Sequence, residues 1–518
     1  MEKELTIGIL SLTPGWETVL NQTGVSYRET TPSETFSPER YSLLIITRAV
    51  TNMEFEQIES YIADGGAIID TGFCIDRLDS GIISQKKIKS ITINNGLPFN
   101  ILCGAIDIYA KVTTFSKAQY LNRMLFIGNH GNGISSFFGI NIDTLLFDMC
   151  SRPKEFYSAL KRAPYEEVSC VSKGDITRLV FNLIKYLHIQ RGIPFVHKWF
   201  FPDGKENVFL FRIDSDFGTQ EQVKKWHDIT EINKIRPTWF LHVAAHEKWL
   251  EIFSQFDGHE IAVHGYDHIT SKKSTVIKQN IEKAQKILKD HDFQCYGHAS
   301  PYGLWNTALN SICEESGFIY SSEFSYCYDS LPLHPVVKNR KSSVLQIPIH
   351  PICIGSLLNV KAQKEEINDY FAGIVNLQKL QYNPLVFYDH VLHEETDVLQ
   401  EFFKNIETVS IPRLTFLEFA NWWINREKST FKAMYGSEDT LVISPSKKLD
   451  ELFFCVWTKP DTYILTNDEV NHSISSQTGN KLDYSLSFDK NTFKRIRKFN
   501  LKIQKNAFIN KMFWRKYR

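Results

Sequence analysis

Paired cysteine motifs are absent from this chain of 518 residues, and its nine cysteines are scattered. Without a CxxC pair the sequence offers no zinc ribbon, and isolated thiols in an odd number indicate a reducing compartment rather than a disulfide framework. A surplus of charge of one sign is also missing, because 59 Lys and Arg residues balance 59 Asp and Glu residues. No overall field therefore draws the molecule onto nucleic acid or an anionic membrane.

Long apolar runs are missing as well. No stretch reaches the roughly 18 consecutive apolar residues of a membrane-spanning helix, and residues 1–10 lack the basic start and apolar centre of a signal peptide. We therefore expect a cytoplasmic protein. Hydrophobic residues make up 43% of the chain and charged residues 23%, values typical of folded globular proteins.

Strand and helix patterns alternate in the first third of the chain. Residues 41–46 form an apolar run typical of a buried strand, residues 51–63 have helical spacing, and residues 67–70 return to strand. This strand–helix–strand unit predicts a parallel α/β sheet. Residues 41–72 resemble the flavodoxin-like layer of class I glutamine-amidotransferase-like domains, which implies such a domain over residues 1–192.

Cys74 follows the last of these strands and is a candidate nucleophile for amidotransferase-type catalysis. A nucleophile elbow needs a helix directly after the cysteine and a histidine that activates the thiol, and the sequence shows neither clearly. We therefore interpret Cys74 as a buried thiol and the N-terminal domain as non-catalytic.

Apolar strands and helical patterns alternate again from residue 208 to residue 407. The helix expected at 274–289 carries an apolar stripe at Ile277, Ile281, Ala284 and Leu288. This many strand–helix units predicts a distorted, incomplete (β/α) barrel, and short strands separated by turns follow it. The predicted α/β organisation has four parts: an N-terminal domain (1–192), the barrel (205–428), a small β domain (433–490) and a basic, aromatic tail (491–518).

Two acidic residues stand at the end of the first barrel strand. Alternation along the strand puts Asp214 and Asp216 on one side, at the strand end where barrel enzymes form their pockets. Two carboxylates this close repel each other unless a cation joins them. The pattern also fits a plain turn in which an Asp caps the helix after Gly218.

Two histidines follow a later apolar strand. His264 and His268 are four residues apart, a spacing that brings both rings to one face of a helical turn, although such pairs also occur in structural roles. Together with an Asp from the earlier strand end, they would supply two nitrogens and one oxygen to a zinc ion. This set leaves room at the metal for water and substrate.

The segments FRIDSDFG, GHEIAVHGYDH and GHASPYGLWN, in this order, resemble the first three motifs of the polysaccharide deacetylase (NodB-homology) family of metal-dependent carbohydrate esterases. The resemblance covers roughly residues 205–425 and implies a barrel of the NodB type. The roles that it implies are general base for Asp214, metal ligand for Asp216, His264 and His268, and oxyanion binding by the backbone N–H of Tyr302.

A leaving amine needs a proton, and histidine is the natural donor at neutral pH. The late strand at 384–390 ends in His390 and is followed by His393, and the family has its acid histidine at such a position. His390 lies nearer the strand end and is the preferred acid, with His393 as the alternative.

The third motif departs from the family pattern. The family has an arginine two residues before the proline, where it orients the base, and Ala299 holds that place here. His298 is a candidate replacement, and a buried structural histidine is the other interpretation.

The resemblance implies a hydrolase that acts on carbon–nitrogen bonds other than peptide bonds. We expect removal of an acetyl group, preferably N-acetyl, from a lipid- or nucleotide-linked sugar in bacterial surface-polysaccharide biosynthesis. Zn²⁺ is the expected cofactor, with Co²⁺ or Ni²⁺ as alternatives. The competing hypothesis is a catalytically impaired carbohydrate-binding scaffold or pseudoenzyme.

Residues 493–518 are rich in Lys, Arg and aromatic residues and contain no acid. Such a segment can lie on an anionic lipid surface, so we expect peripheral contact with the inner face of the membrane. A solvated helix face or an acidic partner are the alternatives. Nucleic acid is not expected, because no known binding motif accompanies these charges.

Overall fold

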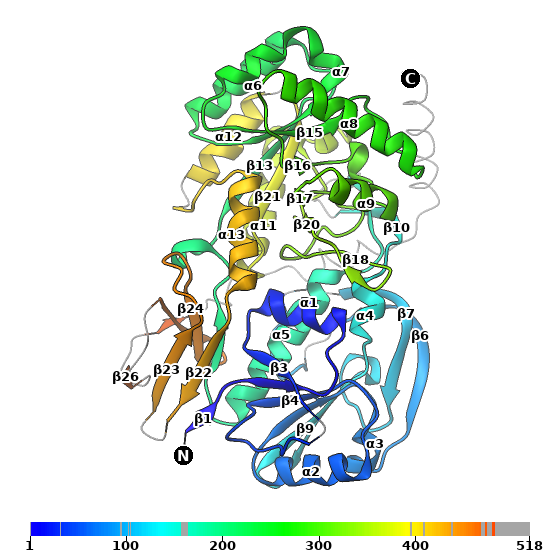
Figure 1. Ribbon diagram of the computed structural model, residues 1–518, viewed down its shortest axis with the longest axis vertical. Coiled ribbons are helices and arrows are strands. Elements are labelled where there is room, and N and C mark those ends of the chain that lie inside the picture. The colour runs from blue at the N-terminus through cyan, green and yellow to red at the C-terminus, as the bar shows by residue number, and fades with distance from the viewer. Residues whose placement is uncertain are drawn as a thin grey trace. The chain divides into compact units, whose positions relative to one another are not determined.

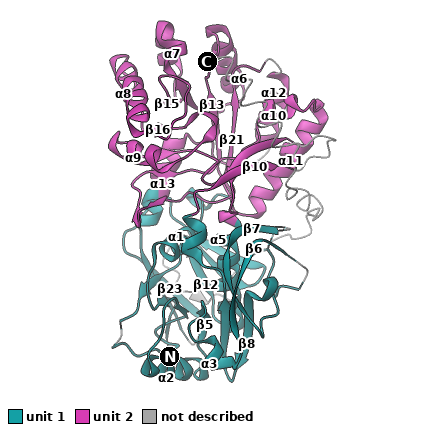
Figure 2. Cartoon of the chain, turned by 90° about the vertical axis from the view of Figure 1, so that its right-hand side faces the viewer, with its two compact units in different colours: residues 1–147, 175–205, 424–487 teal, residues 148–174, 206–423, 488–518 magenta. Residues whose placement is uncertain are grey.

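The computed structural model describes residues 2–31, 33–93, 96–101, 103, 105–156, 164–393, 396–407, 410–436, 439–467, 472–473 and 479–481. It divides into two compact units, which Figure 2 shows in different colours. The segment 493–518, predicted to contact a membrane, lies outside the described residues. Unit 1 comprises residues 1–147, 175–205 and 424–487, and unit 2 comprises residues 148–174, 206–423 and 488–518.

A six-stranded sheet forms the centre of unit 1 (Figure 1). Its order is β3-β2-β4-β5-β9-β8, and all neighbours are parallel except β8, which is antiparallel to β9. Counted without the antiparallel β8, the five parallel strands follow the 2-1-3-4-5 order of a doubly wound sheet. The strands are β2 (Ile7–Ile9), β3 (Tyr27–Glu29), β4 (Leu43–Ile46), β5 (Ala67–Asp70), β8 (Leu125–His130) and β9 (Gly133–Phe138).

Helices cover both sides of this sheet, with α1 and α5 on one side and α2 and α3 on the other (Figure 1). The predicted strand–helix–strand unit is confirmed, because β4, α2 and β5 occupy its three positions. Every residue of β4 and β5 is buried, as the apolar runs indicated. The helices of unit 1 are α1 (Pro14–Thr23), α2 (Asn52–Ala63), α3 (Ile75–Asp79), α4 (Ile142–Leu146) and most of α5 (Lys173–Gln190), with the short 3-10 helices η1 (Leu121–Arg123) and η2 (Pro202–Gly204).

Two antiparallel four-stranded sheets and one hairpin belong to unit 1 as well. Late strands of the chain pair here with early ones, because β22 lies beside β1 and β24 lies beside β12. Both sheets contribute to one hydrophobic core. The compact units therefore run across the predicted domain boundaries, which stay a prediction. The strands are β1 (Lys3–Glu4), β22 (Phe431–Tyr435), β23 (Thr440–Pro445) and β26 (His472–Ser473); β12 (Phe195–Lys198), β24 (Phe454–Lys459), β25 (Thr462–Thr466) and β27 (Asn480–Lys481); and the hairpin β6 (Ile83–Thr92) and β7 (Ala105–Phe115).

Unit 2 is built on a curled parallel sheet of seven strands that forms a half-barrel (Figure 1). The order is β20-β17-β16-β15-β14-β13-β21, so β13 lies inside the sheet between β14 and β21. The carboxyl ends of parallel strands meet at one edge, which is where barrel enzymes form their sites. The strands are β13 (Phe209–Asp214), β14 (Thr238–His242), β15 (Glu260–Gly265), β16 (Gly297–His298), β17 (Tyr320–Ser321), β20 (Leu345–Gln346) and β21 (Leu385–His390).

Helices follow most strands of unit 2, and the stripe predicted at 274–289 is confirmed, because its four apolar residues are buried on α8. Residues 247–255 form a 3-10 segment, η3, in which Trp249 has non-helical backbone angles. The helices are α6 (Gln220–Ile232), α7 (Val243–His246), η3 (Glu247–Gln255), α8 (Ser274–Asp290), η4 (Pro301–Gly303), α9 (Thr307–Glu315), α10 (Ile354–Asn359), α11 (Lys364–Leu380), α12 (Thr396–Glu407) and most of α13 (Phe416–Lys428), and the hairpins pair β10 (Ser151–Glu155) with β11 (Tyr165–Ser169) and β18 (Val336–Val337) with β19 (Arg340–Lys341).

An aromatic cluster holds β13 and β21 in place. Phe209 and Phe211 of β13 contact Phe402, and Phe387 of β21 contacts Phe371 of α11. Each buried ring removes a large apolar area from water, and burial stabilises the fold by about 25 cal/mol for each Å² of apolar surface. The two strands that carry the acidic residues and His390 are therefore anchored from the side opposite the site.

All nine cysteines are free thiols, as their scattered positions predicted. Among the described residues, no helix combines the length and the apolar character that crossing a lipid bilayer requires.

Glu54 at the first turn of α2 accepts hydrogen bonds from the guanidinium of Arg48 and from the N–H and hydroxyl of Thr51. These groups lower the pKa of Glu54 to about 2, the Arg48 hydrogen bond being the largest cause. We expect Glu54→Gln to lower the free energy of unfolding by about 1–2 kcal/mol at pH 7, because the amide keeps the capping acceptor but cannot form the charge-assisted pair with Arg48.

A depressed carboxyl pKa stabilises the fold above the ordinary glutamate pKa, and this contribution is lost as the pH falls toward about 2. The difference between wild type and Glu54→Gln should therefore shrink between pH 5 and pH 3 in urea unfolding followed by circular dichroism, an interval chosen around the reference glutamate pKa of about 4.3. Glu56→Gln, on an exposed position of the same helix, is the matched control. A deficit that stays constant over this pH interval would contradict the account.

Candidate active site

The two acidic residues of the first motif lie at the carboxyl end of β13. Asp214 is the last residue of the strand, and Asp216 follows in a turn with a positive φ of 41°, a conformation that aspartate tolerates better than most residues. The Asp216 carbonyl accepts a hydrogen bond from His242 Nδ1 at 2.8 Å, which holds this turn. The cap of α6 is Thr219, so the interpretation of these acids as helix caps is wrong.

Asp216, His264 and His268 come together at this strand end. Asp216 Oδ1 lies 3.4 Å from His264 Nε2 and 3.2 Å from His268 Nε2. His264 belongs to β15, and His268 lies in the bend after it, where Gly265 has a φ of 110°. The expected helical turn is therefore wrong, and a sharp turn at glycine brings the two rings together instead.

Hydrogen bonding fixes the orientation of the His264 ring. Its Nδ1 lies 2.7 Å from the Ala299 carbonyl oxygen, which can only accept, so Nδ1 carries the hydrogen and Nε2 presents its lone pair to Asp216. Burial lowers the pKa of His264 and keeps the ring neutral, as a metal ligand must be. Burial would raise the pKa of Asp216, but the surrounding histidines, His390 foremost, hold it well below its usual range.

These three side chains fit a divalent metal ion. Among the described residues, Asp216 Oδ1 is buried without a hydrogen-bond partner, although two imidazole nitrogens lie close to it. Ligands at about 2.0–2.1 Å around a tetrahedral zinc are separated by about 3.3 Å, which agrees with the observed 3.2 and 3.4 Å. Two nitrogens and one oxygen form a set that leaves a position open for water.

Arg212 pairs with Asp214 from the same strand. Arg212 Nε donates to Oδ1 at 2.5 Å and Nη2 donates to Oδ2 at 2.6 Å, and both side chains are almost fully buried. A third bond runs from Nη1 to the Ser322 carbonyl at 2.7 Å. Burial would raise the pKa of Asp214, but the Arg212 guanidinium outweighs it and keeps the carboxyl ionised.

This pair supplies a guanidinium to Asp214, the predicted base, although Ala299 stands where the resemblance implies an arginine. His298 does not take that part, because its Nδ1 faces Glu323 Oε1 at 3.4 Å. Our sequence analysis missed Arg212. Its signal was available, since residues two apart on a strand point to the same face.

The structure brings His390 to the two acids. His390 Nε2 lies 3.9 Å from both Asp214 Oδ2 and Asp216 Oδ2. Burial alone would lower the pKa of His390, but Asp216 and its other partners raise it well above the ordinary value. His393 contacts Asp389 instead, with Nε2 and Oδ1 3.5 Å apart.

Two aromatic side chains flank the metal-ligand candidates. The ring of Tyr302 lies 5.0 Å from the His268 ring, and the ring of Phe217 lies 5.6 Å from it. Both remain open to solvent, with exposed fractions of 38% for Tyr302 and 53% for Phe217. Phe217 was missed in the sequence because a lone aromatic after a strand carries no signal of its own.

Cys74 lies in unit 1 at the start of α3 and is fully buried. Burial is the main cause that raises the pKa of its thiol, and the neighbouring Asp70 adds to it. A thiol that stays protonated is a poor nucleophile, which agrees with the interpretation of Cys74 as a buried thiol.

Part of unit 2 matches the model of a known family. Residues 209–321 match the model of the family described as polysaccharide deacetylase. This span includes Asp214, Asp216, His264, His268 and Tyr302, and it ends before His390. No curated protein matches the chain.

Several solved structures are similar to the chain over part of its length. A candidate polysaccharide deacetylase from Mycobacterium smegmatis is 16% identical, with 44% of this chain and 93% of that one covered and a TM-score of 0.37. The peptidoglycan deacetylase PdaC from Bacillus subtilis is 14% identical, with 43% and 95% covered and a TM-score of 0.30. A CE4 family pseudoenzyme from Bacillus anthracis is 12% identical, with 52% and 89% covered and a TM-score of 0.30.

Breaking the buried pair of Arg212 and Asp214 should lower the free energy of unfolding. Arg212→Met leaves a buried carboxylate unpaired, so we expect the free energy of unfolding to fall by about 3–5 kcal/mol in urea titrations. The double variant Arg212→Met/Asp214→Leu removes both charges and should recover much of this loss.

Arg236→Met is the matched control, because the pair of Arg236 with Glu418 is exposed and should contribute about 1 kcal/mol or less. A double variant no more stable than Arg212→Met alone would show that the unpaired charge is not the cause.

Proposed function

We propose that unit 2 is a metal-dependent deacetylase that hydrolyses an acetyl group, most simply an N-acetyl group, on a saccharide. The observation that carries this proposal is the convergence of Asp216, His264 and His268 beside an acid that Arg212 holds ionised. The match of residues 209–321 to the polysaccharide deacetylase family supports the substrate class.

Asp216, His264 and His268 would hold the ion, for which zinc is the best fit and cobalt or nickel are alternatives. A bound divalent ion would polarise the acetyl carbonyl and acidify water. The protein's part is to orient the ligands, and the His264 bond to the Ala299 carbonyl does this for one ring.

Asp214 is the proposed general base. Arg212 occupies one lone-pair direction on each carboxylate oxygen, so each oxygen keeps a second lone pair that can take a proton. The bidentate pair also fixes the plane of the carboxylate, which places the base reproducibly without a rotamer search.

His390 is the proposed general acid. Its Nε2 faces both Asp214 and Asp216 at 3.9 Å, so a protonated ring is electrostatically favoured and can pass a proton to a leaving amine. His393 is the less suitable alternative, because it faces Asp389 instead. The backbone N–H of Tyr302 is the proposed donor to the developing oxyanion.

A saccharide would lie against Phe217 and Tyr302. Exposed aromatic rings at a polar site offer flat apolar surfaces for the apolar faces of sugar rings. The lipid or nucleotide linkage, the role in surface-polysaccharide biosynthesis, the cytoplasmic location and the amidotransferase-like character of the N-terminal domain stay predictions.

One experiment should distinguish the proposed general base, Asp214, from the proposed metal ligand Asp216. With zinc-loaded, full-length protein and an N-acetylglucosamine oligomer, we expect Asp214→Asn to keep its metal and lose acetate release about 10²–10⁴-fold, the usual worth of a general base. Asp216→Asn should lose both metal and activity. Metal content by mass spectrometry and acetate release by an enzymatic assay give the two readouts.

Acetate release that survives both chelation and Asp214→Asn would defeat the proposal. Protein without a divalent ion that still binds the oligomer would favour the carbohydrate-binding scaffold.

The acid is tested by comparing two histidine variants. We expect His390→Gln to lower kcat at least 100-fold, because general-acid catalysis contributes about 10²–10⁴. His393→Gln should lower kcat much less than His390→Gln does. The reverse order in steady-state kinetics would exchange the two assignments.

A further inference from the structure

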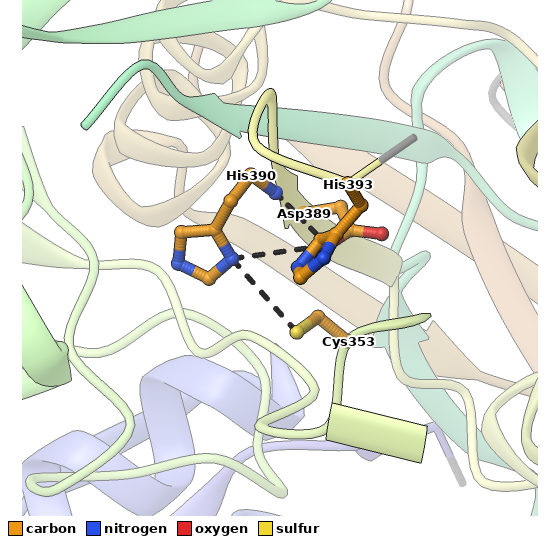
Figure 3. A group of neighbouring side chains, drawn as sticks. All are labelled: Cys353, Asp389, His390 and His393. Carbon is orange, nitrogen blue, oxygen red and sulfur yellow. Dashed lines mark hydrogen bonds and ion pairs between the residues drawn. The ribbon is translucent and has the colours of Figure 1, made fainter. Parts of the chain in front are cut away.

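Four side chains gather beside the proposed site on its β21 side, and we call them the Cys353 cluster: Cys353, Asp389, His390 and His393. Asp389 and His390 end β21, His393 lies three residues further on, and Cys353 precedes the first turn of α10. Figure 3 shows the thiol and the two rings around the Asp389 carboxylate. One ligand atom from each residue lies within 4.8 Å of all the others.

The contacts between the side chains of the cluster are long, although the one between His390 Nδ1 and Cys353 Sγ is within the range of a hydrogen bond to sulfur. His390 Nδ1 lies 3.9 Å from Cys353 Sγ and 3.7 Å from Asp389 Oδ1, and His393 Nε2 lies 3.5 Å from Asp389 Oδ1. Direct N–H···O bonds measure about 2.7–3.2 Å. Ligands around a tetrahedral zinc are about 3.3–3.6 Å apart, given bonds of about 2.0–2.3 Å, so the observed spacing is closer to that of a shared ion.

The surroundings of the cluster leave room for this arrangement. Cys353 and Asp389 are buried, while the two imidazoles are partly open to solvent, which gives an ion a path of entry. Gly355 on α10 lies against His393, and a Cβ at this position would overlap the ring. Glycine therefore allows the ring to approach Cys353 closely.

We infer that the Cys353 cluster is a second metal site, distinct from the Asp216 site, that binds Zn²⁺ through Cys353 Sγ, Asp389 Oδ1, His390 Nδ1 and His393 Nε2. One thiolate, two imidazoles and one carboxylate form a set suited to this borderline-soft ion. Binding displaces the protons held by Cys353 Sγ and His390 Nδ1, and both pass to water.

The second site has a consequence for catalysis, which rests on the proposed function. His390 uses Nδ1 in the Cys353 cluster and faces Asp214 and Asp216 with Nε2. A metal on Nδ1 takes the lone pair that a proton would need, so the ring could not become the imidazolium that donates to a leaving amine. Zinc beyond the first equivalent should therefore inhibit the enzyme.

Cobalt distinguishes the two sites, because thiolate-bound Co²⁺ shows an intense charge-transfer band in the near ultraviolet and the Asp216 site contains no sulfur. We expect full-length protein titrated with Co²⁺ to bind two ions and to develop this band. Cys353→Ser should abolish the band and reduce the stoichiometry to one. Cys150→Ser is the matched control, since Cys150 is an exposed thiol, and it should keep the band.

His393→Gln retains every cysteine and should weaken or shift the band. If Cys353→Ser does not fold, this variant is the test, and a band that it leaves unchanged would contradict the second site. No band in the wild type, or a band that survives Cys353→Ser, would overturn the second site. These readouts are independent of turnover, so they stand if the proposed function fails. Where acetate release is measurable, inhibition by excess zinc should require at least tenfold more metal in Cys353→Ser, and equal inhibition would overturn the link to His390.

Discussion

The buried ion pair between Arg212 and Asp214 is the interaction on which the geometry of the candidate site depends. Two charges inside a protein are costly to desolvate, and they are tolerated only when hydrogen bonds satisfy them. Here the guanidinium binds both carboxylate oxygens and the Ser322 carbonyl, so the end of β13 is tied to the segment after β17. The turn that carries Asp216 starts from this fixed point, and it is met by His264 from β15 and by His268 from the bend after β15.

The parallel arrangement of unit 2 followed from its alternating apolar runs, because a buried parallel strand leaves a strong signal in sequence. The helices between these strands were predictable too. At residues 274–289 the apolar stripe indicated both the helix and the face that it buries. The pairing of β22 and β24 with β1 and β12 was not predictable, because antiparallel pairing between distant segments leaves no local pattern. The strands were visible as short strands, but their partners were not.

The candidate site divides in the same way. Asp214, Asp216, His264 and His268 were recognisable because the spacing within each short motif is local. The way in which the His264 and His268 rings come together could not be predicted, because a turn at Gly265 replaces the expected helical turn. Cys353 had no signal at all, since it reaches Asp389 and His390 only through the position of α10.

Unit 1 is assembled from three stretches of chain, and most of unit 2 lies between the second and the third. Strands β1 and β12 emerge early from the ribosome, yet β22 and β24, which complete their sheets, are made only after the half-barrel. Until β22 and β24 are made, the backbone N–H and C=O groups of β1 and β12 that will pair with them lack these hydrogen-bond partners. The half-barrel can therefore fold before the two antiparallel sheets of unit 1 are complete, and these sheets close their hydrogen bonding last.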